Sequence, residues 1–179
     1  MVDAGGKADR SNSEVTHGNG EIPVYPIYLT GLDRYLTVVV GGGPIGERKI
    51  RALLAGAARV RLIAPDATPQ LQTWAAEGTI EWWPRPYQSG DLGGALLAFA
   101  ATNQRSVNAQ VASDARNLRI LFNVADRAEE GNFHTPALYR REGAVIAVGS
   151  TGKNPRWVKA LRDRIARLCE NLDIFTHNS

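Results

Sequence analysis

A glycine-rich segment between a predicted strand and a predicted helix constrains the fold of this 179-residue chain more than any other feature. The stretch before it, residues 36–40 (LTVVV), is apolar and rich in β-branched residues, as is typical of a strand buried on both faces. Gly41, Gly43 and Gly46 follow at once in the spacing G-x-G-x-x-G. Beyond them, apolar residues recur on one face of a predicted helix. This strand–turn–helix context predicts a dinucleotide-binding segment.

Each of the three glycines has a physical reason in such a segment. Gly41 lets the chain turn sharply out of the strand, Gly43 lets a pyrophosphate approach the backbone, and Gly46 lets helix and strand pack closely. The helix N-terminus adds unpaired N–H groups and a partial positive charge. The alternative is that these glycines only shape a tight strand-to-helix turn.

Strands and helices are predicted to alternate along the next eighty or so residues, which indicates a parallel sheet of the Rossmann type. The strand at 80–83 is expected to pair at the sheet edge. We therefore expect a disordered leader over 1–21, an NAD-binding domain over 22–130 and a smaller α+β region over 131–179. Further strands are predicted at 59–64, 80–83, 96–101 and 120–124, and helices at 71–78 and 107–117.

Two polar positions follow predicted strands and are candidates for cofactor contacts. Asp66 comes shortly after the second strand, near the place where an acidic residue holds the ribose hydroxyls of NAD. It is equally suited to capping the helix that follows. No arginine directly follows this strand to bind a 2′-phosphate, which favours NAD over NADP. Thr102 and Asn103 end a later strand and are expected to open onto the ligand crevice.

Asp126 ends the strand at 120–124, which we predict to be a central strand of the sheet. Its carboxylate is then expected to face the same crevice as the glycine loop. There it could accept a proton from a substrate that loses a hydride to a nicotinamide. The alternative is a loop aspartate that caps the next segment.

The region after Gly131 has a different character. Residues 138–143 read as a polar turn, 144–148 as a short strand and 155–172 as a helix. One face of this helix is predicted to carry Trp157, Leu161, Ile165 and Leu168. The opposite face is basic, and it is either solvated or holds an acidic substrate or partner. Its cations are Arg156, Lys159, Arg162, Arg164 and Arg167.

Composition limits the remaining classes of function. The net charge of +3 suits an anionic ligand, and we expect neither nucleic-acid nor membrane binding. The single cysteine, Cys169, cannot form an intrachain disulfide, which fits a cytoplasmic setting. His134 has no second ligand at metal-binding spacing, so no metal site is predicted.

Several motifs in a fixed order resemble the siroheme synthase family, and more narrowly its precorrin-2 dehydrogenase/sirohydrochlorin ferrochelatase module. The order runs from VVVGGGPIGERKIRALL through VRLIAP, AATN and FNVAD to NFHTPA and AVGSTGKNP, followed by a basic helix. The resemblance extends over residues 22–170. It implies an NAD-dependent oxidation of precorrin-2 to sirohydrochlorin, in many members followed by insertion of ferrous iron in the same pocket. It also implies a homodimer, with the region after the Rossmann domain contributing to the interface.

The resemblance also assigns residues. The family's catalytic aspartate falls on Asp126, and its cofactor contacts fall on the glycine loop with Pro44 and Ile45, on Pro65 and Asp66, and beside Thr102. The tetrapyrrole substrate carries many carboxylates, which gives the basic helix a rationale. The candidate substrate-binding residues are His134, Ser150, Lys153 and Arg156. The competing interpretation is a non-catalytic Rossmann module that senses NAD and changes a partner surface.

Overall fold

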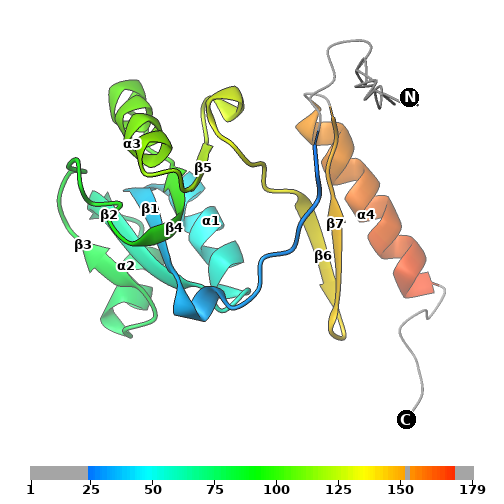
Figure 1. The fold of residues 1–179 in the computed structure, drawn as a ribbon. Coiled ribbons are helices and arrows are strands. Elements are labelled where there is room, and N and C mark those ends of the chain that lie inside the picture. Colours follow the sequence, from blue (N-terminus) through cyan, green and yellow to red (C-terminus); the bar gives the residue numbers. More distant parts are fainter. Residues whose placement is uncertain (1–23, 152–153, 172–179) are drawn as a thin grey trace, which may run out of the picture. The chain divides into compact units, whose positions relative to one another are not determined.

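A computed structural model of the chain describes residues 24–151 and 154–171 (Figure 1). The chain divides into two compact units, which we describe separately. The sheet unit comprises residues 27–135. The hairpin unit comprises the described residues before 27 and after 135. The predicted leader lies outside the described residues. None of the described helices combines the length and the apolar character that crossing a bilayer requires.

The sheet unit contains a five-stranded parallel sheet with the strand order β3-β2-β1-β4-β5. This confirms the predicted α/β fold and the position of the 80–83 segment at one edge. The strands are β1 (Leu36–Gly42), β2 (Arg59–Ala67), β3 (Glu81–Trp83), β4 (Ala95–Ala100) and β5 (Leu121–Val124).

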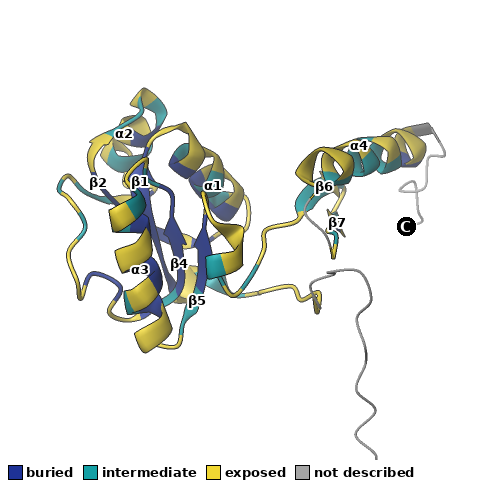
Figure 2. Ribbon diagram, turned by 90° about the horizontal axis from the view of Figure 1, so that it is seen from above, coloured by how far each residue is buried: buried dark blue, intermediate teal, exposed yellow. Residues whose placement is uncertain are grey.

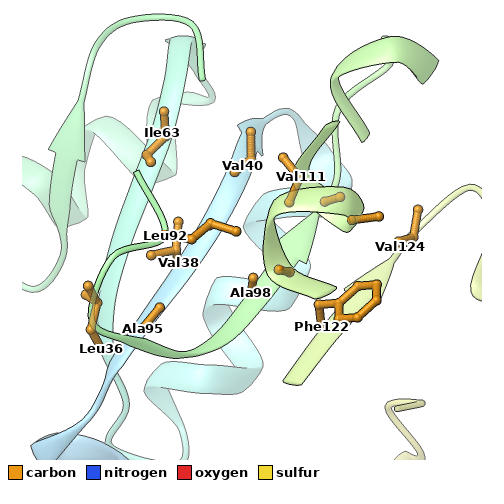
Figure 3. Close-up of a cluster of buried hydrophobic side chains, with 13 residues drawn as sticks. Leu36, Val38, Val40, Ile63, Leu92, Ala95, Ala98, Val111, Phe122 and Val124 are labelled. Carbon is orange, nitrogen blue, oxygen red and sulfur yellow. The ribbon is translucent and has the colours of Figure 1, made fainter. Parts of the chain in front are cut away.

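Helices cover both faces of this sheet. Figure 2 shows the buried strands lying between them. They are α1 (Pro44–Leu54), α2 (Pro69–Ala76) and α3 (Arg105–Asn117), with short 3₁₀ turns η2 (Leu32–Arg34) and η3 (Ala128–Glu130). All seven residues of β1 are buried. Val38 and Val40 point into the cluster beneath α3 (Figure 3), and Val39 joins the other cluster with Ile50 of α1. Alternation along one strand therefore supplies both cores.

The prediction that Asp126 follows a central strand is wrong, because β5 is the outer strand of the sheet. Periodicity identifies a buried strand, but it carries no information on the order of strands. The free edge of β5 is occupied by the side chain of Asn132. Its Oδ1 accepts from the Phe122 N–H at 2.8 Å and its Nδ2 donates to the Ile120 carbonyl at 3.0 Å. The Asn132 N–H donates to the Phe122 carbonyl at 3.0 Å.

The hairpin unit consists of an antiparallel pair, β6 (Ala137–Arg141) and β7 (Ala144–Val148), and of helix α4 (Pro155–Asn171). The polar turn predicted over 138–143 is therefore wrong for most of its length. The turn is confined to Glu142 and Gly143, which have φ values of 49° and 81°. Two consecutive positive φ angles are typical of the tight turns that match the twist of a hairpin.

Helix α4 begins at Pro155 as predicted, and only part of its predicted apolar face is covered, with Leu161 and Ile165 half-buried. Trp157 and Leu168 are 53% and 51% exposed, whereas Cys169 is buried. Arg162, one of the cations of the predicted basic face, donates from Nη1 to the Leu138 carbonyl at 2.9 Å. A long arginine side chain can lie along an apolar surface, so its charge does not identify the outer face.

Candidate functional site

A cleft of about 570 Å³ lies at the carboxyl ends of β1, β2 and β4. Its position is the switch point of the sheet, where β1 has β2 on one side and β4 on the other. Seven of the predicted cofactor residues line it, and Pro86, Tyr87 and Val107 complete an apolar wall. The seven are Gly41, Gly43, Pro44, Ile45, Pro65, Asp66 and Thr102.

The glycine loop has the geometry that the sequence predicts. Gly41 has a φ of +116°, and a Cβ there would collide with the carbonyl group of Ala101, the residue that follows β4. Gly46 does not line the cleft, because it is buried where α1 crosses the end of β1, and a Cβ there would collide with the Gly41 carbonyl oxygen. A Cβ at Gly43 would meet nothing within 4 Å, so that position is open toward the cleft.

The start of α1 is suited to binding an anion. Gly43 is the N-cap residue and Pro44 the first helical residue, and no described side chain caps the helix. The first-turn N–H groups are therefore available to a ligand, and the helix dipole favours a negative charge there. Together with the open position at Gly43, this arrangement fits a pyrophosphate group.

Asp66 is not the cap of the second helix. Thr68 is the N-cap of α2, and its Oγ1 accepts from the Leu71 N–H at 3.4 Å. Opposite Gly41, the pairing of β1 with β2 is irregular, and Ala64, Pro65 and Asp66 fill the gap between the pairs Val40–Ile63 and Gly42–Ala67. Asp66 is consequently exposed at the rim of the cleft, where a carboxylate can accept from ribose hydroxyls.

A side-chain link that the sequence did not predict fastens α1 to the start of α2. The Thr68 hydroxyl donates to Glu47 Oε2 at 2.8 Å, and Arg51 Nη2 donates to Glu47 Oε1 at 2.6 Å. These bonds, first the one from Thr68 and then the one from Arg51, lower the pKa of Glu47. The link holds the helix that carries the glycine loop beside the rim that carries Asp66.

Asp126 follows β5 and is not among the residues that line the cleft. Asn108 Nδ2 donates to Asp126 Oδ1 at 2.9 Å, and Arg105 Nη1 donates to both oxygens at 3.4 and 3.3 Å. Arg105 also pairs with Glu130, and this pairing is the first cause of the raised pKa of the Arg105 guanidinium. The Asp126 side chain is still 38% exposed, so a substrate can reach it.

Lys49 is a further half-buried charge that the sequence did not single out. Its Nζ donates to Asn123 Oδ1 at 2.7 Å and lies 5.0 Å from the centre of the Phe99 ring. Asn123 in turn donates from Nδ2 to the Phe133 carbonyl at 3.1 Å. Burial, and secondly the charge of Arg48, lowers the pKa of Lys49 to about 8.

The predicted substrate-binding residues do not form one cluster in either unit. His134 is exposed near the end of the sheet unit. Ser150 and Arg156 belong to the hairpin unit, Ser150 half-buried after β7 and Arg156 exposed in the first turn of α4. Lys153 lies outside the described residues. Across the described part of the chain, no group of three or more His, Cys, Asp or Glu residues is placed to hold a metal ion.

Asn108 and Arg105, which contact Asp126, are among the site residues that the sequence analysis missed. A signal for Asn108 was present, since it shares the i, i+3, i+4, i+7 spacing with Val111, Ala112 and Ala115 on the inward face of α3. A polar residue at such a position is buried, and a buried amide has hydrogen-bond partners. The partner itself was not predictable, because Asp126 is 18 residues away.

Comparison with known proteins identifies a family and several relatives of this chain. Residues 31–137 match the profile of a family described as putative NAD(P)-binding. Siroheme synthase 3 of Aeromonas hydrophila is 37% identical over 143 residues, which cover 80% of this chain and 30% of that protein. The siroheme synthase of Chromobacterium violaceum is 38% identical over 144 residues, with the same coverage. The chain thus spans less than a third of the length of these relatives.

A solved structure resembles the fold over most of the chain. It is that of "SirC, precorrin-2 dehydrogenase", which is 27% identical in sequence and superimposes with a TM-score of 0.69. The match covers 83% of this chain and 71% of the SirC chain.

Proposed function

This chain belongs to the putative NAD(P)-binding family, and on that premise we propose that it oxidises precorrin-2 to sirohydrochlorin with NAD⁺. The observation that carries the proposal is the bond of Asp126 to Asn108, which also binds Thr102 at the wall of the glycine-loop cleft. One side chain thus links the proposed catalytic carboxylate to the cleft in which we propose that the nucleotide binds. The likeness to a precorrin-2 dehydrogenase and to a part of siroheme synthases supports the choice of substrate.

The residues of the chain divide the work as follows. Bound NAD⁺ would supply the acceptor for the hydride that the tetrapyrrole loses. The open backbone at Gly43 and the N-terminus of α1 bind the pyrophosphate, and Asp66 accepts from the ribose hydroxyls. Asp126 takes up the proton that leaves the substrate with the hydride, so that two electrons and two hydrogens are removed in all. Arg105 and Asn108 keep this carboxylate oriented.

NAD is the cofactor that we propose rather than NADP. Among the described residues that line the cleft, only Asp66 is charged, and its carboxylate would repel a 2′-phosphate. We expect NADH to bind at least about tenfold more tightly than NADPH. Replacement of Asp66 by asparagine is expected to narrow this difference, as measured by quenching of protein fluorescence.

The hairpin unit is proposed to bind the carboxylates of the substrate and to form a homodimer. The exposed cations on α4, among them Arg156 and Arg164, supply charge for the carboxylates. Trp157, Leu168 and Tyr25 are large apolar residues at least half exposed in this unit, which supports an apolar interface between two copies. Light scattering coupled to gel filtration tests the dimer.

We also propose a second activity for the same aspartate, the insertion of ferrous iron into sirohydrochlorin. Iron would enter as a substrate, and the Asp126 carboxylate would draw protons from the pyrrole nitrogens. The test is siroheme formation from sirohydrochlorin and Fe²⁺ without NAD⁺. Absence of siroheme would end this part of the proposal and leave the dehydrogenase part intact.

The experiment for the main proposal is an anaerobic assay with precorrin-2 and NAD⁺ that follows both NADH and sirohydrochlorin absorbance. Wild-type protein is expected to form the two products in equal amounts. The Asp126→Ala variant is expected to lose about 10²–10⁴-fold in kcat. Asp33→Ala, which removes an exposed aspartate of η2, is the matched control and is expected to behave as wild type.

Two outcomes would contradict the proposal. Equal turnover by Asp126→Ala and Asp33→Ala would remove the role of Asp126. NADH binding without any turnover of precorrin-2 by the wild-type protein would favour the NAD-sensing module instead.

A further inference from the structure

Asn108 is a fully buried polar residue on the inward face of α3. Its neighbours along that face, Val111, Ala112 and Ala115, are apolar and buried. A side-chain amide taken out of water destabilises the fold unless its hydrogen bonds are replaced. An apolar residue of similar size would fill this space equally well. The hydrogen bonds that Asn108 makes therefore need an explanation.

Asn108 uses both ends of its amide. Oδ1 accepts from the Thr102 N–H at 3.1 Å and from the Thr102 hydroxyl at 2.7 Å. Nδ2 donates to the Thr102 carbonyl at 3.1 Å and to Asp126 Oδ1 at 2.9 Å. The backbone N–H and carbonyl of Thr102 fix which end of the amide is which, because one can only donate and the other can only accept.

We infer that Asn108 is a positioning residue that holds the Asp126 carboxylate and the Thr102 turn as one unit. Thr102 lines the nucleotide cleft after β4, and Asp126 follows the adjacent strand β5. One rigid side chain therefore sets the distance between the cleft and the carboxylate. The consequence for catalysis rests on the proposed function, whereas the consequence for geometry and nucleotide binding does not.

Arg105 also contacts Asp126 but is less suited to this role. Its side chain is 41% exposed, and its bonds to the carboxylate are long, at 3.3 and 3.4 Å. It is shared with Glu130 as well. A buried, shorter bond from a side chain with few free rotations fixes the direction of a carboxylate better than an exposed, shared one.

The variant Asn108→Asp tests the inference with little change of volume. It keeps an acceptor for the Thr102 N–H, but where the donor was it places an oxygen against both the Thr102 carbonyl and Asp126 Oδ1. We expect kcat with precorrin-2 to fall about 100-fold, since misplacing one catalytic group by about 1 Å has such an effect. Asn117→Asp is the matched control, an exposed asparagine at the end of the same helix, with an expected change below about twofold.

A double-mutant cycle separates positioning from a general structural role. In an Asp126→Ala background, Asn108→Asp is expected to lower kcat by less than about threefold, because its effect acts through the missing carboxylate. Multiplicative losses in the double variant would overturn the inference. Asn108→Ser provides the same cycle if Asn108→Asp does not fold, as judged by circular dichroism.

Binding and spectroscopy keep this test independent of the proposed reaction. NADH binding is expected to weaken about fivefold or more in Asn108→Asp because the Thr102 turn shifts, and to stay within about twofold in Asp126→Ala. The ¹³Cγ resonance of Asp126 is expected to move in Asn108→Asp but not in Asn117→Asp. The wild-type protein could fail to oxidise precorrin-2 while Asn108→Asp still weakens NADH binding and moves the Asp126 resonance. In that case the proposed function fails and the positioning role stands. An unchanged resonance overturns the role.

Discussion

The two units of the chain bury their residues to very different degrees. All seven residues of β1 in the sheet unit are buried, and apolar clusters fill both faces of its sheet. Across β6 and β7 of the hairpin unit, Val148 alone is buried. On α4, Trp157 and Leu168 are exposed. A parallel sheet enclosed by helices is self-sufficient, whereas a hairpin with one helix leaves apolar surface uncovered.

This difference indicates how stability and function are distributed. The sheet unit carries the nucleotide cleft on a scaffold whose two apolar clusters are built from its own residues, although Ile27, Tyr28 and Tyr35 at its surface are exposed. If the homodimer proposed above forms through this unit, the partner would supply the burial that the hairpin unit lacks. The substitutions below probe this contrast, beginning with the largest expected effect.

The glycine loop is where the sheet unit is most sensitive. Gly46→Ala is expected to abolish NADH binding and to destabilise the protein by about 3 kcal/mol or more, because the new Cβ collides with the Gly41 carbonyl of β1. Gly43→Ala is expected to fold as the wild type and to weaken NADH binding, since its Cβ meets no protein atom within 4 Å. Urea denaturation and fluorescence titration measure the two effects. Equal stability of both variants would contradict the packing argument.

A matched pair of isoleucines compares the two cores directly. Ile50→Ala in α1 removes a fully buried side chain, and we expect a loss of about 2–5 kcal/mol in the free energy of unfolding. Ile165→Ala in α4 removes a half-buried one, with an expected loss near 1 kcal/mol for the monomer. Chemical denaturation at low protein concentration gives both values. A larger loss for Ile165→Ala would show that the hairpin unit is packed as completely as the sheet unit.

Lys49 gives the sheet unit a pH-dependent weakness. Burial lowers the pKa of Lys49 from 10.5 to about 8, so between these values the unfolded chain holds more protons than the folded one. The free energy of unfolding therefore rises with pH across this window, and we expect about 1 kcal/mol after allowing for partial exposure. In Lys49→Met this rise is expected to disappear. Urea denaturation below about pH 10 measures the free energy of unfolding of both proteins. The difference between them separates the contribution of Lys49 from that of tyrosine ionisation.

The smallest effect on folding is expected at the exposed residues of α4. Trp157→Ser should lower the free energy of unfolding of the monomer by about 1 kcal/mol or less, because more than half of the side chain is already exposed. The same change is expected to shift the protein toward a monomer in light scattering. Ala160→Ser on the same helix is the exposed control for the assembly. A dimer that is indifferent to Trp157→Ser would place the interface elsewhere.

Local features of the sequence predicted the sheet unit well. The β-branched run before Gly41 and the spacing of the glycines determine the strand, the turn and the start of α1, because each depends on nearby residues. The outer position of β5 was missed, since strand order depends on which chain segments meet in space. The strand at 137–141 was missed because Arg140 and Arg141 give it a polar character, although an arginine stem can lie against an apolar surface.

The candidate site divides in the same way. Glycines and strand ends indicated the residues that line the cleft, because their roles follow from backbone geometry. The bonds among Thr102, Asn108 and Asp126 join three separate elements, and no spacing in the sequence reveals them. The role of Asp66 was left open between two choices, and the capping of α2 by Thr68 excludes one of them.

The side chain of Asn132 has a consequence for the behaviour of the protein in a crowded solution. An outer strand with free backbone groups is a template on which another chain can add a strand and begin an aggregate. By bonding to the Phe122 N–H and the Ile120 carbonyl, Asn132 occupies hydrogen-bonding groups that an incoming strand would need. One amide thus protects the β5 margin of the sheet from intermolecular β-pairing.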